Sequence, residues 1–168
     1  MASATVSGLK AKSDAAYANI SRQLQGMEPY LDKSDAPGEW TARQVVAHLL
    51  FEPGWDPVAV LKSFAKTDLP LVEIKGSFTD TSGARATAGV KQLLEALDAQ
   101  RKAVFGYLDG LSDAELQRKA RIPLFKQLMG NEEVPIPVYV SALFDYHWND
   151  HAGQLAKIRK AVGLPEAK

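Results

Sequence analysis

The sequence contains no cysteine, and this absence removes three kinds of chemistry at once. The chain of 168 residues can form no disulfide, offer no thiolate to a metal ion and use no cysteine nucleophile of its own. Any thiol that takes part in its chemistry must therefore come from another molecule.

The sequence also has no excess of charge of either sign. Lys and Arg together number 20, Asp and Glu together number 20, and the formal net charge is +0. A chain without a basic balance has no overall field that attracts nucleic acid or an anionic membrane surface. We therefore expect neither nucleic acid nor membrane among its partners.

Long hydrophobic runs are missing as well. No run approaches the about 20 apolar residues of a transmembrane helix, and the first ten residues lack the apolar core of a secretory signal. These absences predict a cytoplasmic protein.

The composition, with 46% hydrophobic and 24% charged residues, is that of an ordinary globular chain. The length of the chain predicts a single domain over residues 1–168.

Apolar residues recur at three- and four-residue spacing in four long segments, which is the period of amphipathic helices. We expect the third of these helices to begin between Thr81 and Arg85. No segment alternates as a half-buried strand does, so the pattern predicts an all-α helix bundle. The four segments cover residues 6–24, 41–50, 90–108 and 137–163.

Shorter segments fill the connections between these helices. Residues 58–66 resume helical spacing, and Ser112 with Glu115 forms a capping box that predicts a short helix. We expect a loop at residues 67–83. We expect irregular structure at residues 120–136, where prolines and a glycine interrupt every pattern.

Histidine is scarce, yet the three histidines are placed as a helical metal site requires. His147 and His151 are four residues apart in the last predicted helix, so both rings leave the same face and can bind one ion. His48, in the second predicted helix, could supply the third ligand. Neutral imidazoles bind zinc, nickel, copper and iron, and three protein ligands leave a coordination position open for water or substrate.

A purely structural role for the histidines is the competing interpretation. An HxxxH pair also arises by chance in helices, and this one lacks the glutamate of the HExxH motif of zinc proteases. However, His147 and His151 occupy positions of the apolar stripe, and burying two unpartnered imidazoles in a core costs free energy. A shared metal ion would remove that cost.

Around these histidines the sequence resembles the DinB/YfiT-like superfamily, over nearly the whole chain. The likeness is carried by Trp40-Thr-Ala-Arg-Gln-Val-Val-Ala-His48 and by His147-Trp-Asn-Asp-His151-Ala-Gly-Gln154. The resemblance implies a four-helix bundle with a long crossover and short extra helical segments. It also implies a divalent zinc, nickel or iron ion held by one histidine of the second helix and an HxxxH pair of the last. Those positions match His48, His147 and His151.

The same resemblance implies a reaction. Better understood members of the family look like S-transferases or a maleylpyruvate isomerase that use mycothiol, bacillithiol or glutathione, and members often form dimers. The leading hypothesis is therefore a homodimeric, thiol-cofactor-dependent S-transferase acting on small electrophilic substrates. The alternatives are a metal-dependent hydrolase and a non-catalytic bundle that binds a metal or a small ligand.

Helical spacing adds two candidates to the histidines. Glu52 follows His48 by four residues, so it could face the metal as a fourth ligand, as a partner of a ligand or as a general base. The alternative is an exposed glutamate, since Pro53 and the following glycine interrupt the helix here. Gln154 follows His151 by three residues and could hydrogen-bond to its ring.

Overall fold

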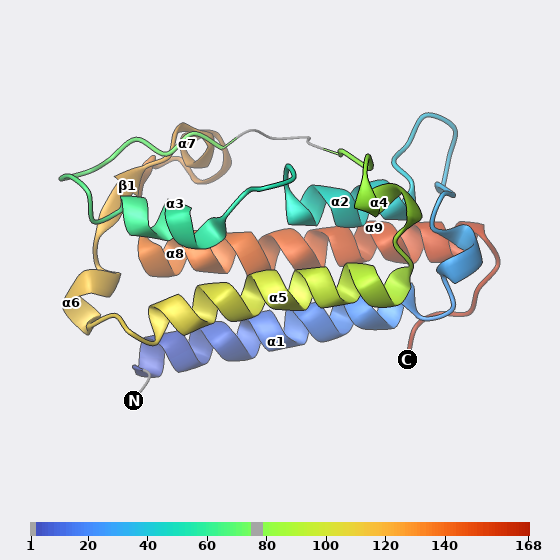
Figure 1. The fold of residues 1–168 in the computed structure, drawn as a ribbon, viewed down its shortest axis with the longest axis horizontal. Helices are drawn as coiled ribbons and strands as arrows, with labels where there is room; N and C mark the ends of the chain where they lie inside the picture. The colour runs from blue at the N-terminus through green and yellow to red at the C-terminus, as the bar shows by residue number, and fades with distance from the viewer. Residues whose placement is uncertain (1–2, 75–78) are drawn as a thin grey trace.

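Four long helical segments carry the fold in the computed structural model, which describes residues 3–74 and 79–168 (Figure 1). The last of them is a single continuous helix in which a π-helical segment, η2, separates α8 from α9. The prediction of an all-α bundle is confirmed. The segments are α1 (Ala4–Leu24), α2 (Ala42–Leu50) followed by α3 (Pro57–Ser63), α5 (Val90–Leu108), and α8 (Ile136–Ser141), η2 (Ala142–Tyr146) and α9 (His147–Ala161).

The arrangement of these helices requires a long crossover. In Figure 1, α1 and α9 run in one direction along the bundle, whereas α2 and α5 run in the other. The helix α1 packs against α5 and α9, and α2 packs against the same two helices. Because α2 and α5 are parallel neighbours, the chain between them must return along the length of the bundle.

Side-chain hydrogen bonds fix both ends of α2. Thr41 accepts a hydrogen bond from the backbone N–H of Gln44, and the Gln44 side chain accepts one from the backbone of Thr41. At the other end, Phe51 has a φ of 58°, which turns the chain out of the helix. The guanidinium of Arg85 donates to the carbonyl groups of Ala47 and Phe51, which the end of the helix leaves without partners.

The predicted start of the third long helix is wrong. The residues expected to begin it form a separate turn, α4 (Ala84–Thr87), and Ala88 then takes an extended conformation with a ψ of 131°. The helix α5 begins only at Val90, whose backbone N–H donates to the carboxylate of Glu28. The local side chain of Gln92, which accepts from the backbone N–H of Gly89, and a side chain from a distant part of the chain therefore cap this boundary together.

The segment expected to be irregular, residues 120–136, is also ordered. The strand β1 (Lys119–Arg121) pairs antiparallel with β2 (Glu133–Pro135), and α7 (Pro123–Met129) occupies the connection between them. Leu71 forms an isolated parallel bridge to Arg121 of this small sheet, in which the N–H of Val72 donates to the carbonyl of Arg121. The remaining short elements are η1 (Glu28–Tyr30) and the predicted helix α6 (Asp113–Leu116).

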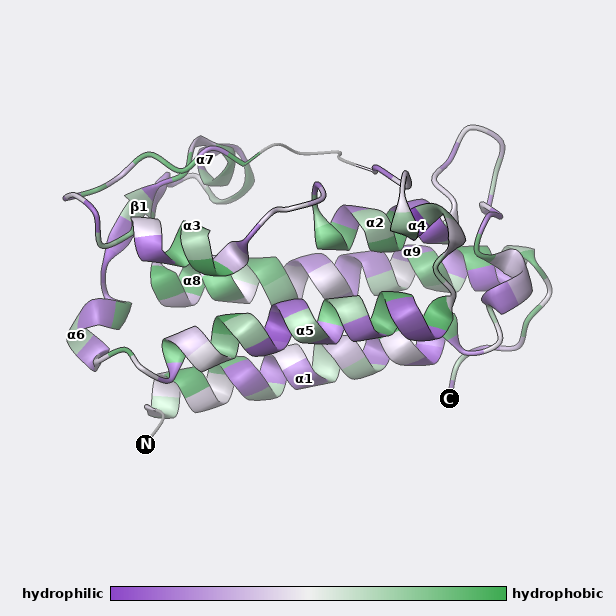
Figure 2. Cartoon of the chain, in the orientation of Figure 1, coloured by the Kyte–Doolittle hydropathy of each residue, from purple (hydrophilic) through white to green (hydrophobic). Residues whose placement is uncertain are grey.

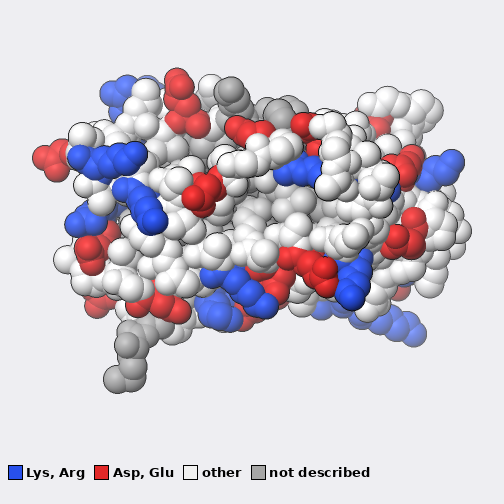
Figure 3. Space-filling view, viewed as in Figure 1, with Lys and Arg blue, Asp and Glu red and all other residues white. Residues whose placement is uncertain are grey.

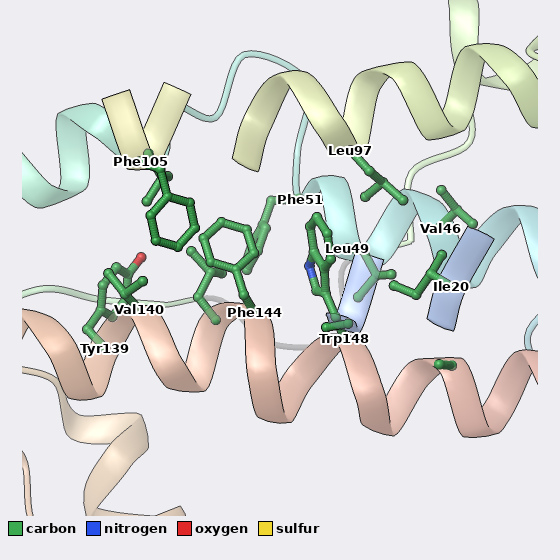
Figure 4. Packing of buried hydrophobic residues seen from close by; sticks show 14 of the residues in the cluster. Ile20, Val46, Leu49, Phe51, Leu97, Phe105, Tyr139, Val140, Phe144 and Trp148 are labelled. Carbon is green, nitrogen blue, oxygen red and sulfur yellow. The ribbon is translucent and has the colours of Figure 1, made fainter. Parts of the chain in front are cut away.

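The core lies between the long helices and is rich in aromatic rings (Figure 4). Trp148 is fully buried and meets the ring of Phe144 edge-on at 4.9 Å between centroids, and Phe144 packs at 5.8 Å from Phe105. Figure 2 shows hydrophobic and hydrophilic residues alternating along these helices, as the amphipathic pattern predicts. The packed core thus fixes the helix that carries His147 and His151.

The surface carries charges of both signs. On the face shown in Figure 3, Lys and Arg residues are interspersed with Asp and Glu residues and do not gather into one basic patch. Among the described residues, no helix is both long enough and apolar enough to cross a membrane.

Candidate metal centre

The three histidines come together in the bundle. His48 lies on α2, and His147 and His151 lie on the first turns of α9. One ring nitrogen of each histidine lies within 4.8 Å of the corresponding atoms of the other two. The Nε2 atoms of His48 and His147 are 2.9 Å apart. The structure therefore brings together all three residues that the sequence analysis singled out as ligands.

The ring of His151 is held on the side away from this cluster. Its Nδ1 lies 2.9 Å from Oε1 of Gln154, the partner expected from helical spacing. Because an amide oxygen only accepts, Nδ1 must carry the proton, and Nε2 keeps its lone pair for another partner. Trp40 stacks on the same ring with 6.0 Å between centroids and 14° between planes.

The ring of His147 is oriented by an irregularity of its own helix. The backbone N–H of His147 donates to the carbonyl of Ala142, five residues earlier, as in a π-helix. In a regular α-helix it would bond to the carbonyl of Leu143. The backbone of Leu143 instead makes a hydrogen bond with the imidazole of His147. The η2 segment therefore releases a backbone group that holds the ring.

The surroundings keep His147 neutral. Burial lowers its pKa to about 3, and the charged forms of His151 and His48 act in the same direction, against the hydrogen bond with Leu143. At neutral pH this imidazole is therefore unprotonated. That is the state in which a histidine offers a lone pair to a metal ion.

The cluster fits a divalent first-row metal ion. Zn–N bonds of about 2.0–2.1 Å place the nitrogens of a tetrahedral site roughly 3.3 Å apart. The nitrogens of the cluster lie 2.9 Å apart for one pair and within 4.8 Å for all three. Small ring rotations would bring all three onto one ion. Such a set of neutral nitrogens suits zinc, nickel or iron.

A cavity of about 290 Å³ lies beside two of the histidines. His48 and His147 line it, together with mostly apolar side chains from α7, α8 and the residues that follow α2. Phe51 and Trp55 belong to this lining and stack with 4.1 Å between centroids and 20° between planes. The arrangement places a space of ligand size next to the cluster.

Comparison with known proteins agrees with this architecture. The family model of the DinB superfamily matches residues 5–155. The chain belongs to the DinB superfamily. The resemblance drawn from the sequence is thus confirmed. No curated protein matches the chain.

A solved structure shares the fold of this DinB-superfamily chain. YfiT from Bacillus subtilis is similar with a TM-score of 0.73 and 18% identity, over 95% of this chain and 89% of that one. It is described as "a probable metal-dependent hydrolase with an unusual four-helix bundle topology". The bundle with its crossover is therefore an arrangement that both proteins have.

In this DinB-superfamily chain, Glu52 lies beside the cluster without belonging to it. The helical spacing that singled it out does not apply, because α2 ends at Leu50 and Phe51 turns the chain. Glu52 is half-buried and lines the cavity together with His48. Burial lowers the pKa of the nearby Arg85 guanidinium, and the charges of Asp80 and Glu52 act against that shift. Glu52 is therefore placed to act on a molecule in the cavity.

Other cavity residues of this family member had no sequence signal. Glu73 and Val72 lie in the connection that was expected to be a surface loop. Leu124, Phe125 and Leu128 lie on α7, inside the segment expected to be irregular. A helical pattern in residues 123–129 is too short to stand out, since seven residues make only two turns.

Proposed function

We propose that this chain is a divalent-metal-dependent enzyme that acts on a small molecule. The observation that carries the proposal is the convergence of His48, His147 and His151 beside a mostly apolar cavity. A zinc, nickel or iron ion bound there would supply a Lewis acid that lowers the pKa of a thiol or a water molecule. The description of YfiT as metal-dependent supports the same class.

The surrounding residues have distinct roles in this proposal. Gln154 holds His151 by its Nδ1, and the backbone of Leu143 holds the ring of His147, so only small rotations of these rings are needed when an ion binds. The cavity walls keep water away from a bound substrate, which strengthens electrostatic interactions inside. Glu52, which lines the same cavity, accepts the proton that the nucleophile releases.

Within this class we propose thiol S-transfer as the reaction. The chain has no cysteine, so a low-molecular-weight thiol must supply the sulfur. The thiol loses its proton to Glu52 or to solvent, and the sulfur attacks an electrophilic carbon of the substrate. A C–S bond forms, and the leaving group departs with its electron pair. The mostly apolar cavity would hold the electrophile beside His48 and His147.

Metal-dependent hydrolysis is the second candidate, and the position of Glu52 in the cavity supports it. A carboxylate that shares a cavity with two of the histidines can remove a proton from an attacking water molecule. The description of YfiT as a probable hydrolase points in the same direction. The two candidates differ in one requirement, because only the transferase needs an added thiol.

The first experiment is elemental analysis of tag-free protein, with His48→Ala, His151→Ala and Asp150→Ala as variants. Asp150 is exposed between the two histidines of α9, so its replacement is the matched control. We expect near-stoichiometric metal in the wild type and in Asp150→Ala, and loss of metal in both histidine variants. Wild-type protein that binds neither zinc, nickel nor iron would contradict a metal-dependent function.

Turnover then separates the reactions. The metal-loaded protein is incubated with electrophiles and with esters and amides, each with and without mycothiol, bacillithiol or glutathione. Product that requires a thiol supports the transferase, and product that forms without one supports the hydrolase. Metal affinity without any product would identify a non-catalytic binding protein.

The homodimer, the cytoplasmic location and the single domain remain predictions. Light scattering on the purified chain tests whether it forms a homodimer.

A further inference from the structure

We infer that the cavity selects a small apolar substrate whose body carries no negative charge, and that the reacting end of this substrate lies at His48 and His147. This inference rests on the proposed function, since it assigns a substrate class to the same site. It is carried by the size of the cavity, by the nature of its walls and by the charges that line it.

The size of the cavity limits the substrate to a small molecule. At about 290 Å³ it is close to the lower end of the about 300–1,000 Å³ found for ligand pockets. A single ring with a short chain suits such a volume. The stacked rings of Phe51 and Trp55 and the side chains of Leu124 and Phe125 provide apolar surface for that body.

The charges that line the cavity are unfavourable to anions. Glu52 and Glu73 contribute carboxylates, and the described residues of the lining include no Lys or Arg. The phenol of Tyr139 is neutral at neutral pH, and burial raises its pKa further. A carboxylate or phosphate on the substrate body would lose its hydration and meet charges of its own sign.

The guanidinium of Arg85 does not offset the negative charge of the cavity lining for a bound ligand. Arg85 lies near Glu52, but it already donates to the backbone carbonyls of Ala47, Phe51 and Asp80. Turning it toward the cavity would leave the end of α2 without its partner. The cavity therefore accepts a neutral or a cationic body and discriminates against an anionic one.

The mouth of the cavity contains a residue that can be changed without disturbing the core. Leu128 on α7 lines the cavity and is nevertheless 70% exposed. Its neighbour Met129 is 56% exposed and does not belong to the lining. These two residues form a matched pair. A change to aspartate adds a charge to the exposed surface of α7 at either position, but it changes the cavity lining only at Leu128.

Three probes with one apolar body test the inference: 3-phenylpropanol, 3-phenylpropylamine and 3-phenylpropionate. The metal-free protein is used, so that the anion cannot bind through an added ion. Binding is followed by the indole N–H signal of Trp55, one of three tryptophans, assigned with Trp55→Phe. We expect the alcohol and the amine to bind at least about tenfold more tightly than the carboxylate.

Variants separate the contributions of shape and charge. Leu128→Asp should weaken binding of the alcohol severalfold, whereas Met129→Asp should leave it unchanged. Glu73→Gln should reduce the preference against the carboxylate, whereas Glu39→Gln, at an exposed position outside the lining, should not. Equal binding of alcohol and carboxylate, or a Trp55 signal that no probe moves at millimolar concentration, would overturn the inference.

The outcome is distinguishable from a failure of the proposed function. Metal that binds and is lost in the histidine variants, together with equal binding of the three probes, would overturn only the substrate class. Absence of metal binding, together with the expected probe order, would overturn the metal-dependent function and leave a cavity selective for non-anionic ligands.

Discussion

The side chain of Gln154 decides which nitrogen of His151 faces the other two histidines. We expect Gln154→Met to weaken zinc affinity about 10- to 100-fold, because the ring loses the partner that fixes its tautomer and direction. Competition with a chromogenic chelator measures this affinity. Lys157→Met, at an exposed position of the same helix, is the control and should bind zinc as the wild type does. Unchanged affinity in Gln154→Met would show that Trp40 alone is sufficient to hold the ring.

The lowered pKa of His147 predicts a pH dependence of stability in the metal-free protein. The folded-state pKa of about 3 lies below the ordinary value of 6.5, so between these values the unfolded chain binds the additional proton. The free energy of unfolding should therefore decrease as the pH falls from 6.5 toward 3. Urea titrations of the wild type and of His147→Gln measure the difference. A variant that retains the full slope would exclude His147 as its source.

Single residues were predictable from the sequence where helical periodicity placed them. His48, His147, His151 and Gln154 lie on long helices, so their spacing specifies their directions. The same helical spacing singled out Glu52, but this residue lies beyond the end of α2. The turn at Phe51, and not the helix, places it at the cavity. Pro53 and the glycine after it predicted that the helix ends here, but no pattern indicated the turn at Phe51 itself, because a positive φ at a phenylalanine is uncommon.

Among the elements, η2 has the most direct effect on the site. A π-helical segment contains one residue more than an α-helix of the same length, so removing one residue should restore regular α-helix. Tyr146 is 68% exposed and can be deleted without removing a core side chain. We expect the deletion to retain helix content but to weaken zinc affinity by about tenfold or more, because the Leu143 carbonyl returns to the backbone ladder.

Circular dichroism and the chelator assay measure the two expected effects of the Tyr146 deletion. Tyr146→Ala is the control, since it removes the same side chain and keeps the π-helical segment. The two variants should then differ in affinity but not in fold. Equal zinc affinity in both would show that the hydrogen bond from the His147 ring to the Leu143 backbone contributes nothing to the site.

Elements were predictable where the apolar period extends over several turns, as in α1, α5 and α9. The prediction failed where tertiary contacts set the structure. Glu28 caps α5 from a distant part of the chain, and β1 and β2 are three-residue strands that exist only as a pair. Such short elements contain too few residues for a period to show.

At the scale of the whole molecule, the cluster joins parts of the chain that are far apart in sequence. His48 and His147 are 99 residues apart, and the crossover and α5 lie between them. An unfolded chain holds three such nitrogens together only at a large entropic cost, so an ion binds the folded state far more tightly. Binding must then stabilise the fold by mass action.

Thermal unfolding with and without zinc measures this linkage. At a free zinc concentration of about 100 times Kd, the expected stabilisation is roughly 2.7 kcal/mol, which raises Tm by about 5–10 °C for a chain of this size. His151→Ala should show a much smaller shift, and Asp150→Ala should show the full one. Magnesium should have little effect on any of them, because it prefers oxygen ligands. A zinc shift of equal size in His151→Ala would mean that the stabilising ion binds elsewhere, and it would separate the stability of the bundle from the three histidines.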